Sequence, residues 1–175
     1  MSALLIQNKF LTNFNVKKNS FLKIENIYYL ILIILIFFFD RYSKIYIVNN
    51  FNESTYYIND YINLNLIWNA GIGFGLLSTE SYLFYNLVTF IVGIVIFALF
   101  YVFAESERLD KFIYTIIIGG ALGNFFDRLV YKAVPDFIDL HYNNFHWFTF
   151  NVADIFITIG IIIFIIRSFF IKSSK

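Results

Sequence analysis

The segment from Ser81 to Ala104 contains no charged residue, and it constrains the fold more than any other part of the chain. A helix needs about 20 predominantly apolar residues to cross the hydrocarbon core of a bilayer, and this segment is long enough. The whole chain is 59% hydrophobic and only 14% charged, which is unusual for a soluble domain. The sequence therefore predicts an integral membrane protein.

Three more apolar segments have a length suited to a membrane span, and they cover about residues 27–48, 111–130 and 151–171. We therefore predict an all-α membrane protein with four transmembrane helices. The helices would form one domain over residues 27–171, between a cytoplasmic amino-terminal tail (1–26) and a short cytoplasmic tail (172–175).

The basic residues indicate the orientation of the helices. Lys and Arg gather in the amino-terminal region, after the second segment and at the carboxyl end, whereas residues 49–80 contain neither and residues 131–150 contain only Lys132. Cytoplasmic loops carry the excess of Lys and Arg. Both termini should therefore be cytoplasmic, with Asp127 and Asp154 near the outer face.

The first outer loop has a pattern of its own. Residues Tyr61 to Leu66 alternate polar and apolar side chains, which is typical of a β-strand. Gly71, Gly73 and Gly75 follow and permit tight turns or close backbone approach. We predict a small outer β element over about residues 52–78, with an aromatic membrane anchor as the alternative.

Two carboxylates are the best candidates for chemistry. Asp136 lies between the third and fourth apolar segments, and Asp154 lies near the start of the fourth. Ionisable groups at membrane depth are costly and are usually functional, and two that converge can share one proton as general acid and general base. The sequence therefore predicts an intramembrane hydrolase. Asp139 competes with Asp136 for the second role, because spacing alone does not separate them.

Several other polar residues read more simply as structural. Asp40 and Lys44 are spaced for an ion pair on one helix face. Asp127 reads as half of an Asp127–Arg128 clamp, and Arg128 has hydrogen-bond donors that could also hold a substrate. Gly119 and Gly123 have the spacing that lets two membrane helices approach closely.

Metal and thiol chemistry are weakly supported. His141 and His146, with Asp139 or Asp136, could form a metal site, but their spacing does not match the helical histidine pair of zinc proteases. We therefore expect no metal. The chain has no cysteine, which excludes disulfides and thiol catalysis, and its net charge of +1 gives no reason to expect a nucleic acid partner.

Five motifs occur in order along the chain: Asp40-x-x-x-Lys44, Asn69-x-Gly71-x-x-Phe74-Gly75, Gly119-Gly120-Ala121-x-Gly123-Asn124-x-x-Asp127-Arg128, Val134-x-Asp136-Phe137 and Phe150-Asn151-x-Ala153-Asp154. Together they resemble lipoprotein signal peptidase (signal peptidase II), the bacterial family of intramembrane aspartyl proteases. The resemblance covers roughly residues 40–160, and the preceding tail shows no matching motif.

The resemblance implies a fold and a set of roles. The fold would be four transmembrane helices, an outer β-cradle after the first, and a short outer helix between the third and fourth. Asp136 and Asp154 would be the catalytic pair. The remaining motif residues divide into a substrate-binding set (Asn69, Gly71, Asn124, Arg128 and Asn151) and a structural set (Asp40, Lys44 and Asp127).

The resemblance also implies a substrate. It would be a prolipoprotein whose Cys already carries diacylglycerol, cut just before that Cys by a monomer in the bacterial inner membrane, without metal or organic cofactor. Two residues depart from the family pattern, since Lys132 stands where Gly is usual and Pro135 where Val is common. A small proton transporter and a non-catalytic membrane scaffold are the alternative functions.

Overall fold

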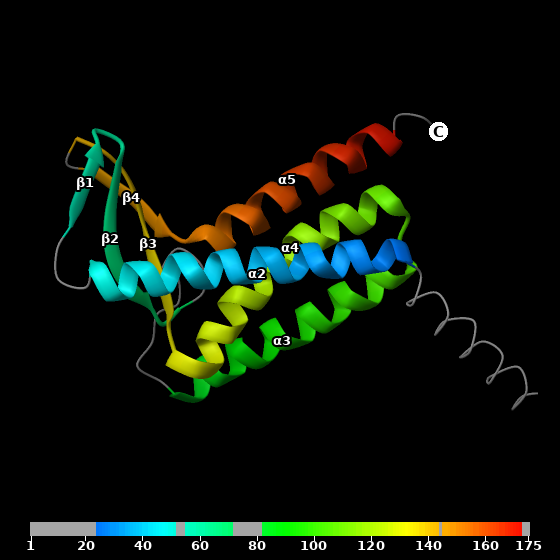
Figure 1. Cartoon of the computed structure of the whole chain (residues 1–175), viewed down its shortest axis with the longest axis horizontal. Helices are drawn as coiled ribbons and strands as arrows, with labels where there is room; N and C mark the ends of the chain where they lie inside the picture. The colour runs from blue at the N-terminus through cyan, green and yellow to red at the C-terminus, as the bar shows by residue number, and fades with distance from the viewer. Residues whose placement is uncertain (1–23, 52–54, 72–81, 144, 173–175) are drawn as a thin grey trace, which may run out of the picture.

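Four helices and four strands make up the computed structural model, which describes residues 24–51, 55–71, 82–143 and 145–172. The elements in chain order are α2 (Ile24–Asn50), β1 (Tyr56–Asn59), β2 (Ile62–Asn69), α3 (Tyr82–Glu105), α4 (Arg108–Tyr131), β3 (Val134–Tyr142), β4 (Phe145–Phe150) and α5 (Val152–Lys172). The helices lie alongside one another and the sheet lies at one end of them (Figure 1). All four predicted helical segments are confirmed as helices.

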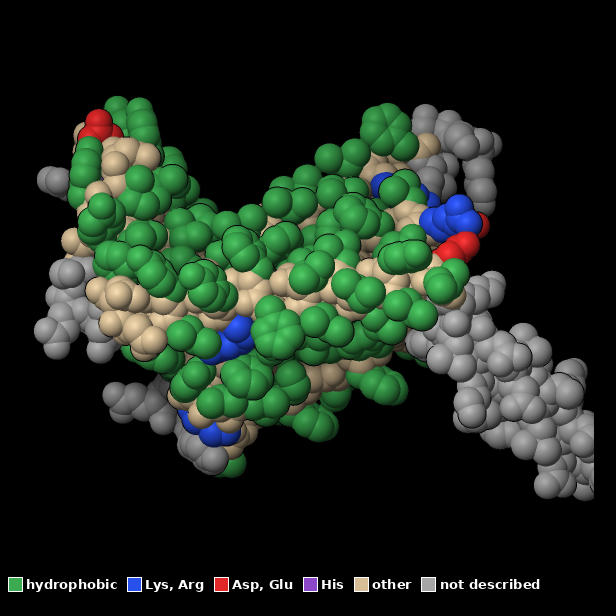
Figure 2. Space-filling view, viewed as in Figure 1, with side chains coloured by type: hydrophobic (Ala, Val, Ile, Leu, Met, Phe, Trp, Pro, Cys, Tyr) green, Lys and Arg blue, Asp and Glu red, His purple; other side chains and the backbone are tan. Residues whose placement is uncertain are grey.

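Three helices within the described part of the chain are long and apolar enough to cross a membrane, namely α3, α4 and α5. Hydrophobic side chains cover most of the helical surface in the view of Figure 2, with few charged groups between its two ends. Many large apolar side chains are exposed, such as Leu83, Phe90 and Phe97 on α3. A surface of this kind suits contact with lipid rather than water.

Helix α4 packs closely against two neighbours through its glycines. A Cβ atom added at Gly119 would lie 2.8 Å from the Ile36 side chain of α2, and one at Gly120 would lie 2.6 Å from the Ala153 carbonyl oxygen of α5. A Cβ at Gly123 would collide with the Asp40 carboxylate. The predicted close helix approach at Gly119 and Gly123 is therefore confirmed, and its partner is α2.

A fully buried ionic cluster joins α2 to α4. Lys44 Nζ donates to Asp40 Oδ2 at 2.7 Å and to Asp127 Oδ2 at 2.8 Å, and Arg41 forms an ion pair with the other oxygen of Asp127. Asp40 Oδ1 accepts a hydrogen bond from the backbone N–H of Ala153 at 2.9 Å. Each carboxylate thus has a cationic partner, which buried charges require.

This cluster confirms one predicted pair and corrects the other. Asp40 and Lys44 form the expected ion pair on α2. The predicted Asp127–Arg128 clamp is wrong, because Asp127 pairs with Arg41 and Lys44 of α2 instead. Consecutive residues on a helix do not face each other, so an adjacent Arg is poorly placed to hold the Asp before it.

The sheet is antiparallel, with the order β1-β2-β3-β4. Asn69 pairs with Val134 and Ile67 with Asp136 between β2 and β3, and Ile138 pairs with Phe150 between β3 and β4. The predicted outer β element is confirmed over β1 and β2, whereas Phe74, Gly75 and the rest of its predicted end at residues 72–78 lie outside the described residues.

The predicted short outer helix between the third and fourth spans is wrong. That stretch forms β3 and β4, apart from residue 144, which is not described. β3 adds to the edge of β2, and its backbone groups are then paired in the ladder. Pro135 is buried near the start of β3, where the lost N–H donor is tolerated.

Replacing Lys44 by Met tests the buried cluster. The substitution removes the cation that the buried carboxylates of Asp40 and Asp127 share. We therefore expect the free energy of unfolding to fall by about 3–5 kcal/mol. Thermal unfolding of the purified protein in detergent measures the change.

Arg108→Gln is the matched control. It removes the exposed Arg108–Glu25 ion pair, and such pairs contribute only about 0–1 kcal/mol. A Lys44→Met protein as stable as Arg108→Gln would contradict the importance given to the cluster.

Candidate active site

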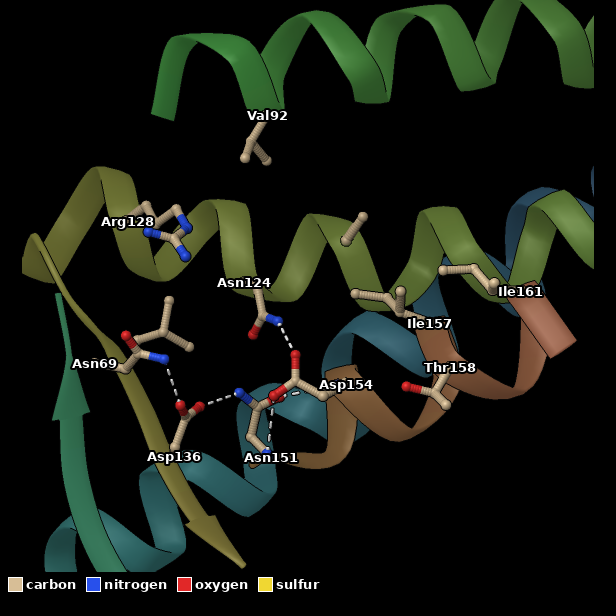
Figure 3. A pocket seen from close by; sticks show the side chains of 12 residues that line it. Asn69, Val92, Asn124, Arg128, Asp136, Asn151, Asp154, Ile157, Thr158 and Ile161 are labelled. Atoms are coloured by element: carbon tan, nitrogen blue, oxygen red, sulfur yellow. Dashed lines mark hydrogen bonds between the residues drawn. The ribbon is translucent and has the colours of Figure 1, made fainter. Parts of the chain in front are cut away.

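A cleft of about 320 Å³ lies where the sheet meets α4 and α5, with Val92 of α3 on its wall. Its polar lining consists of Asn69, Asn124, Arg128, Asp136, Asn151, Asp154 and Thr158, and Figure 3 shows how these side chains converge. The remaining lining is apolar and comes from α3, α4, β3 and α5, as Val92, Ala121, Val134, Ile157 and Ile161. The cleft therefore combines two carboxylates with amide donors and an apolar wall.

Asp136 reaches the cleft from β3 and is 3% exposed. Its Oδ2 accepts a hydrogen bond from Asn69 Nδ2 at 2.8 Å, and its Oδ1 accepts one from Asn151 Nδ2 at 2.5 Å. Burial raises the pKa of the Asp136 carboxyl from its ordinary 3.8 to about 6. The nearby Asp154 carboxylate adds to this rise in pKa, and the two asparagine hydrogen bonds oppose it.

Asp154 reaches the cleft from the first turn of α5. Its Oδ1 accepts a hydrogen bond from Asn124 Nδ2 at 2.8 Å, and its Oδ2 accepts one from the backbone N–H of Asn151 at 3.1 Å. Asn151 Oδ1 in turn accepts from the backbone N–H of Asp154 at 3.1 Å. This reciprocal pair is a capping box, in which Asn151 caps the helix and Asp154 occupies its third position.

Asn151 therefore donates hydrogen bonds to the carboxylates of both Asp136 and Asp154. Its side-chain amide donates to Asp136, while its backbone N–H donates to Asp154. Asn151 is fully buried and lies between the two acids in Figure 3. One residue at the junction of β4 and α5 thus fixes how the two carboxylates face each other.

Asn124 connects the cleft to the buried ionic cluster. Its Oδ1 accepts a hydrogen bond from Lys44 Nζ at 2.7 Å, which leaves its Nδ2 to donate to Asp154. Lys44 therefore determines which way the Asn124 amide faces. This role of Lys44 has no local signal in the sequence, because Lys44 and Asn124 lie 80 positions apart.

Arg128 and Gly71 differ in how they relate to the cleft. Arg128 lines it and is 6% exposed, yet its Nη1 is buried without a hydrogen-bond partner among the described residues. Gly71 does not line the cleft. Its backbone N–H donates to Asn69 Oδ1 at 2.9 Å, so Gly71 orients the Asn69 amide that contacts Asp136.

Asp139, the competing candidate for the acid pair, lies elsewhere. It is not among the residues that line the cleft, and its Oδ2 lies 2.7 Å from His146 Nδ1. Neither His141 nor His146 lines the cleft. The geometry therefore selects Asp136 over Asp139 as the carboxylate that converges with Asp154.

The raised pKa of Asp136 predicts a dependence of stability on pH. Between about pH 4 and about pH 6 the carboxyl holds its proton in the folded state and has lost it in the unfolded state, so stability falls as pH rises through this window. A shift from 3.8 to about 6 corresponds to about 3 kcal/mol. We expect Asp136→Asn to lose this part of the pH dependence.

The measurement compares thermal unfolding at about pH 4 and about pH 7 for the wild type and Asp136→Asn. Asp60→Asn is the control, because Asp60 is an exposed carboxylate in the turn between β1 and β2. Its pH dependence should match that of the wild type. Equal pH dependence in the wild type and Asp136→Asn would show that Asp136 has an ordinary pKa.

Curated proteins with this sequence pattern are named lipoprotein signal peptidases. The protein of Pelagibacter ubique (strain HTCC1062) is 44% identical over 158 residues, which cover 88% of this chain and 95% of that protein. The protein of Francisella tularensis subsp. novicida (strain U112) is 39% identical over 153 residues, covering 84% of this chain and 94% of its own.

The fold is also similar to that of solved structures. A bacterial membrane enzyme determined by the in meso method at 2.3 Å resolution matches with a TM-score of 0.70 and 28% identity, over 84% of this chain and 90% of that chain. The family model described as signal peptidase (SPase) II matches residues 32–170. The chain is a membrane protein and a peptidase, and it belongs to the signal peptidase II family.

Proposed function

We propose that this peptidase is an intramembrane aspartyl endopeptidase that removes the signal peptide from diacylglyceryl-modified prolipoproteins, cutting just before the lipidated Cys. The observation that carries the proposal is the pair Asp136 and Asp154, which line one cleft and are both bonded to Asn151. The names of the relatives supply the substrate class.

Two carboxylates in one water-poor cleft favour a shared proton. Like charges at close range disfavour double ionisation, and the raised pKa of Asp136, about 6, favours retention of its proton up to about pH 6. The ionised member would take a proton from a water molecule, whose oxygen attacks the scissile carbonyl carbon. The protonated member would donate its proton to the carbonyl oxygen. The two acids titrate as a pair, so neither role belongs to one of them alone.

Breakdown of the tetrahedral intermediate returns the protons. The acid that accepted the proton from water would transfer it to the leaving amine, and the C–N bond then breaks. The other acid would recover its proton from the intermediate as the new carboxyl group forms. The same pair of carboxylates thus ends the reaction in its starting protonation state.

A guanidinium donor would hold the peptide in this reaction. Arg128 Nη1 is buried without a partner among the described residues and lines the cleft. A peptide carbonyl is the neutral acceptor that such a donor can bind. Asn69 and Asn124 donate to the two carboxylates, so their role in this proposal is to orient the acids, and through them the bound peptide.

An apolar groove beside the cleft suits the acyl chains of the substrate. It has a volume of about 240 Å³ and is lined by Phe148, Phe150, Ile155 and Ile159, together with Asp154 and Thr158. Asp154 and Thr158 also line the catalytic cleft. An acyl chain in this groove would lie next to the carboxylates, which fits a cut beside a lipid-modified residue.

Cleavage by the purified full-length protein in detergent tests the proposal. The substrate is a prolipoprotein carrying diacylglycerol on its Cys, and mass spectrometry identifies the new amino terminus. We expect Asp136→Asn and Asp154→Asn each to lose at least about 100-fold in rate, as expected for the loss of a general acid or base. Asp60→Asn should cleave like the wild type.

Two results would contradict the proposal. Cleavage at the wild-type rate by either of the cleft variants would remove that Asp from the mechanism. Equal cleavage of the same prolipoprotein without its diacylglycerol would show that the lipid is not part of the recognised substrate.

We also propose that α2 crosses the membrane, which gives four spans. Both termini would then be cytoplasmic, and the cleft would lie near the outer face. We propose that the enzyme works as a monomer. α2 contacts α4 from Asn26, which accepts a hydrogen bond from Lys111, to Lys44, which donates to Asp127, and the two helices cross in the view of Figure 1. At the end away from the sheet, Arg108 pairs with Glu25 and Arg167 pairs with Asp110. Basic residues at that end suit the cytoplasmic side.

Labelling of single cysteines tests this orientation, because the natural chain has none. On intact spheroplasts, a membrane-impermeant maleimide should label Asp60→Cys but label Ser174→Cys only after the membrane is permeabilised. Labelling of Ser174→Cys in intact spheroplasts would contradict the proposed cytoplasmic location of the carboxyl terminus.

A further inference from the structure

The hairpin of β3 and β4 holds a cluster of metal-binding side chains outside the cleft. The carboxylate of Asp139 and the imidazoles of His141 and His146 each offer a donor atom within 4.8 Å of the others. Asp139 and His141 are two residues apart on β3, so they share one face of the strand. His146 is the cross-strand partner of His141, and their rings stack with centroids 5.4 Å apart.

This face of β3 is distinct from the one that serves the cleft. Side chains alternate along a strand, so Asp139 points away from the side on which Asp136 lies. Asp139 and His141 are 2% and 6% exposed, whereas the side chain of His146 is 58% exposed. Two members of the cluster are therefore buried and the third, His146, lies at the surface, where an ion can enter.

Hydrogen bonding within the protein does not satisfy the cluster. Asp139 Oδ2 lies 2.7 Å from His146 Nδ1, but it is 4.0 Å from His141 Nδ1, which is too far for a hydrogen bond. His141 Nδ1 is buried and has no partner among the described residues. A buried polar nitrogen without a partner costs about 1–3 kcal/mol, so its position beside a carboxylate needs an explanation.

A second buried atom without a partner belongs to the residue that pairs with Asp139 across the sheet. Asn63 of β2 pairs directly with Asp139, and residues paired across strands project from the same face of the sheet. Asn63 Oδ1 has no hydrogen-bond partner within the described chain. An unpartnered imidazole nitrogen near the Asp139 carboxylate, with a second imidazole opposite it and an unpartnered amide oxygen on the paired residue, fits a bound cation better than a set of hydrogen bonds.

We propose that Asp139, His141 and His146 form a binding site for a divalent transition-metal ion of the zinc type, independent of the proposed peptidase chemistry. Two imidazole nitrogens and one carboxylate oxygen are a ligand set that zinc accepts, with ligand distances of about 2.0–2.2 Å. The three donor atoms lie within 4.8 Å of one another, and binding would require side-chain rotations that bring each of them to that distance from the ion. Asn63 Oδ1 or a water molecule completes a tetrahedral shell.

The site would join β3 to β4 by coordination. β3 also carries Asp136, three residues before Asp139, so a bound ion would restrain the strand that holds one carboxylate of the cleft. The ion itself would not reach that cleft, because none of its three ligands lines it. The site is therefore structural.

Metal binding by the full-length protein in detergent tests the proposal. The protein must carry no polyhistidine tag and is first stripped with a chelator. We expect the wild type to retain one Zn²⁺ per chain after dialysis, and to show the visible absorption of four-coordinate Co²⁺ when cobalt replaces zinc. Zn²⁺ should also raise the thermal unfolding midpoint, because it binds only the folded site.

His146→Gln should lose the bound Zn²⁺, the cobalt absorption and the zinc-dependent rise in the unfolding midpoint. The side chain is largely exposed, so this variant should fold, and circular dichroism verifies its helix content. Asp60→Asn, which removes an exposed carboxylate from the turn between β1 and β2, should behave like the wild type. The chain has only two histidines and no cysteine, which limits competing sites.

No Zn²⁺ retained by the wild type, or equal retention by the wild type and His146→Gln, would overturn the proposal. These readouts do not depend on peptidase activity, so a failure of the metal site leaves the proposed function untouched. Conversely, a protein that binds Zn²⁺ but does not cleave prolipoprotein would refute only the proposed function.

Discussion

Lys44 is the cation on which both the helix packing and the cleft depend. Its ammonium group lies within 2.8 Å of two carboxylates and one amide oxygen, all supplied by α2 and α4. A carboxylate buried away from water persists only where the protein supplies its partners. The cluster that neutralises Asp40 and Asp127 also orients Asn124, and Asn124 donates to Asp154. Stability and the geometry of the cleft therefore share one electrostatic origin.

Close helix packing makes this arrangement possible. Lys44 reaches Asp127 because α2 and α4 approach at Gly119 and Gly123, where even a methyl group would collide with α2. Gly120 allows α5 the same approach on the other side of α4, and this brings the first turn of α5, with Asp154, beside Asn124. The sheet completes the cleft, since the pairing of β2 with β3 sets Asn69 near Asp136. Small residues in the helices and strand register in the sheet thus position polar groups that are distant in sequence.

The sequence was informative where the signal is local and less so where it depends on tertiary pairing. Apolar length predicted the helices, and the alternation from Tyr61 to Leu66 predicted β2. The β3–β4 hairpin was predicted as a helix from the family resemblance, because whether Val134–Tyr142 adds to the edge of β2 cannot be judged from that segment alone. Ion-pair partners were missed for the same reason, since Asp127 pairs with Arg41 rather than its neighbour. Lys132 caps α4 with φ 57°, the left-handed conformation in which Gly is favoured.

The two carboxylates are held by different kinds of structure, and Asn151 links them. Asp154 is fixed by a helix cap and by the Lys44–Asn124 contacts, which are buried among α2, α4 and α5. Asp136 is fixed by a strand of a sheet that projects from one end of the helices (Figure 1). Any movement of the sheet relative to the helices would therefore change the separation of the two carboxylates. Its hydrogen bonds to Asp136 and Asp154 resist that movement directly at the cleft. Asn151 thus holds the carboxylates of β3 and α5 at a fixed separation, which neither the helices nor the sheet does alone.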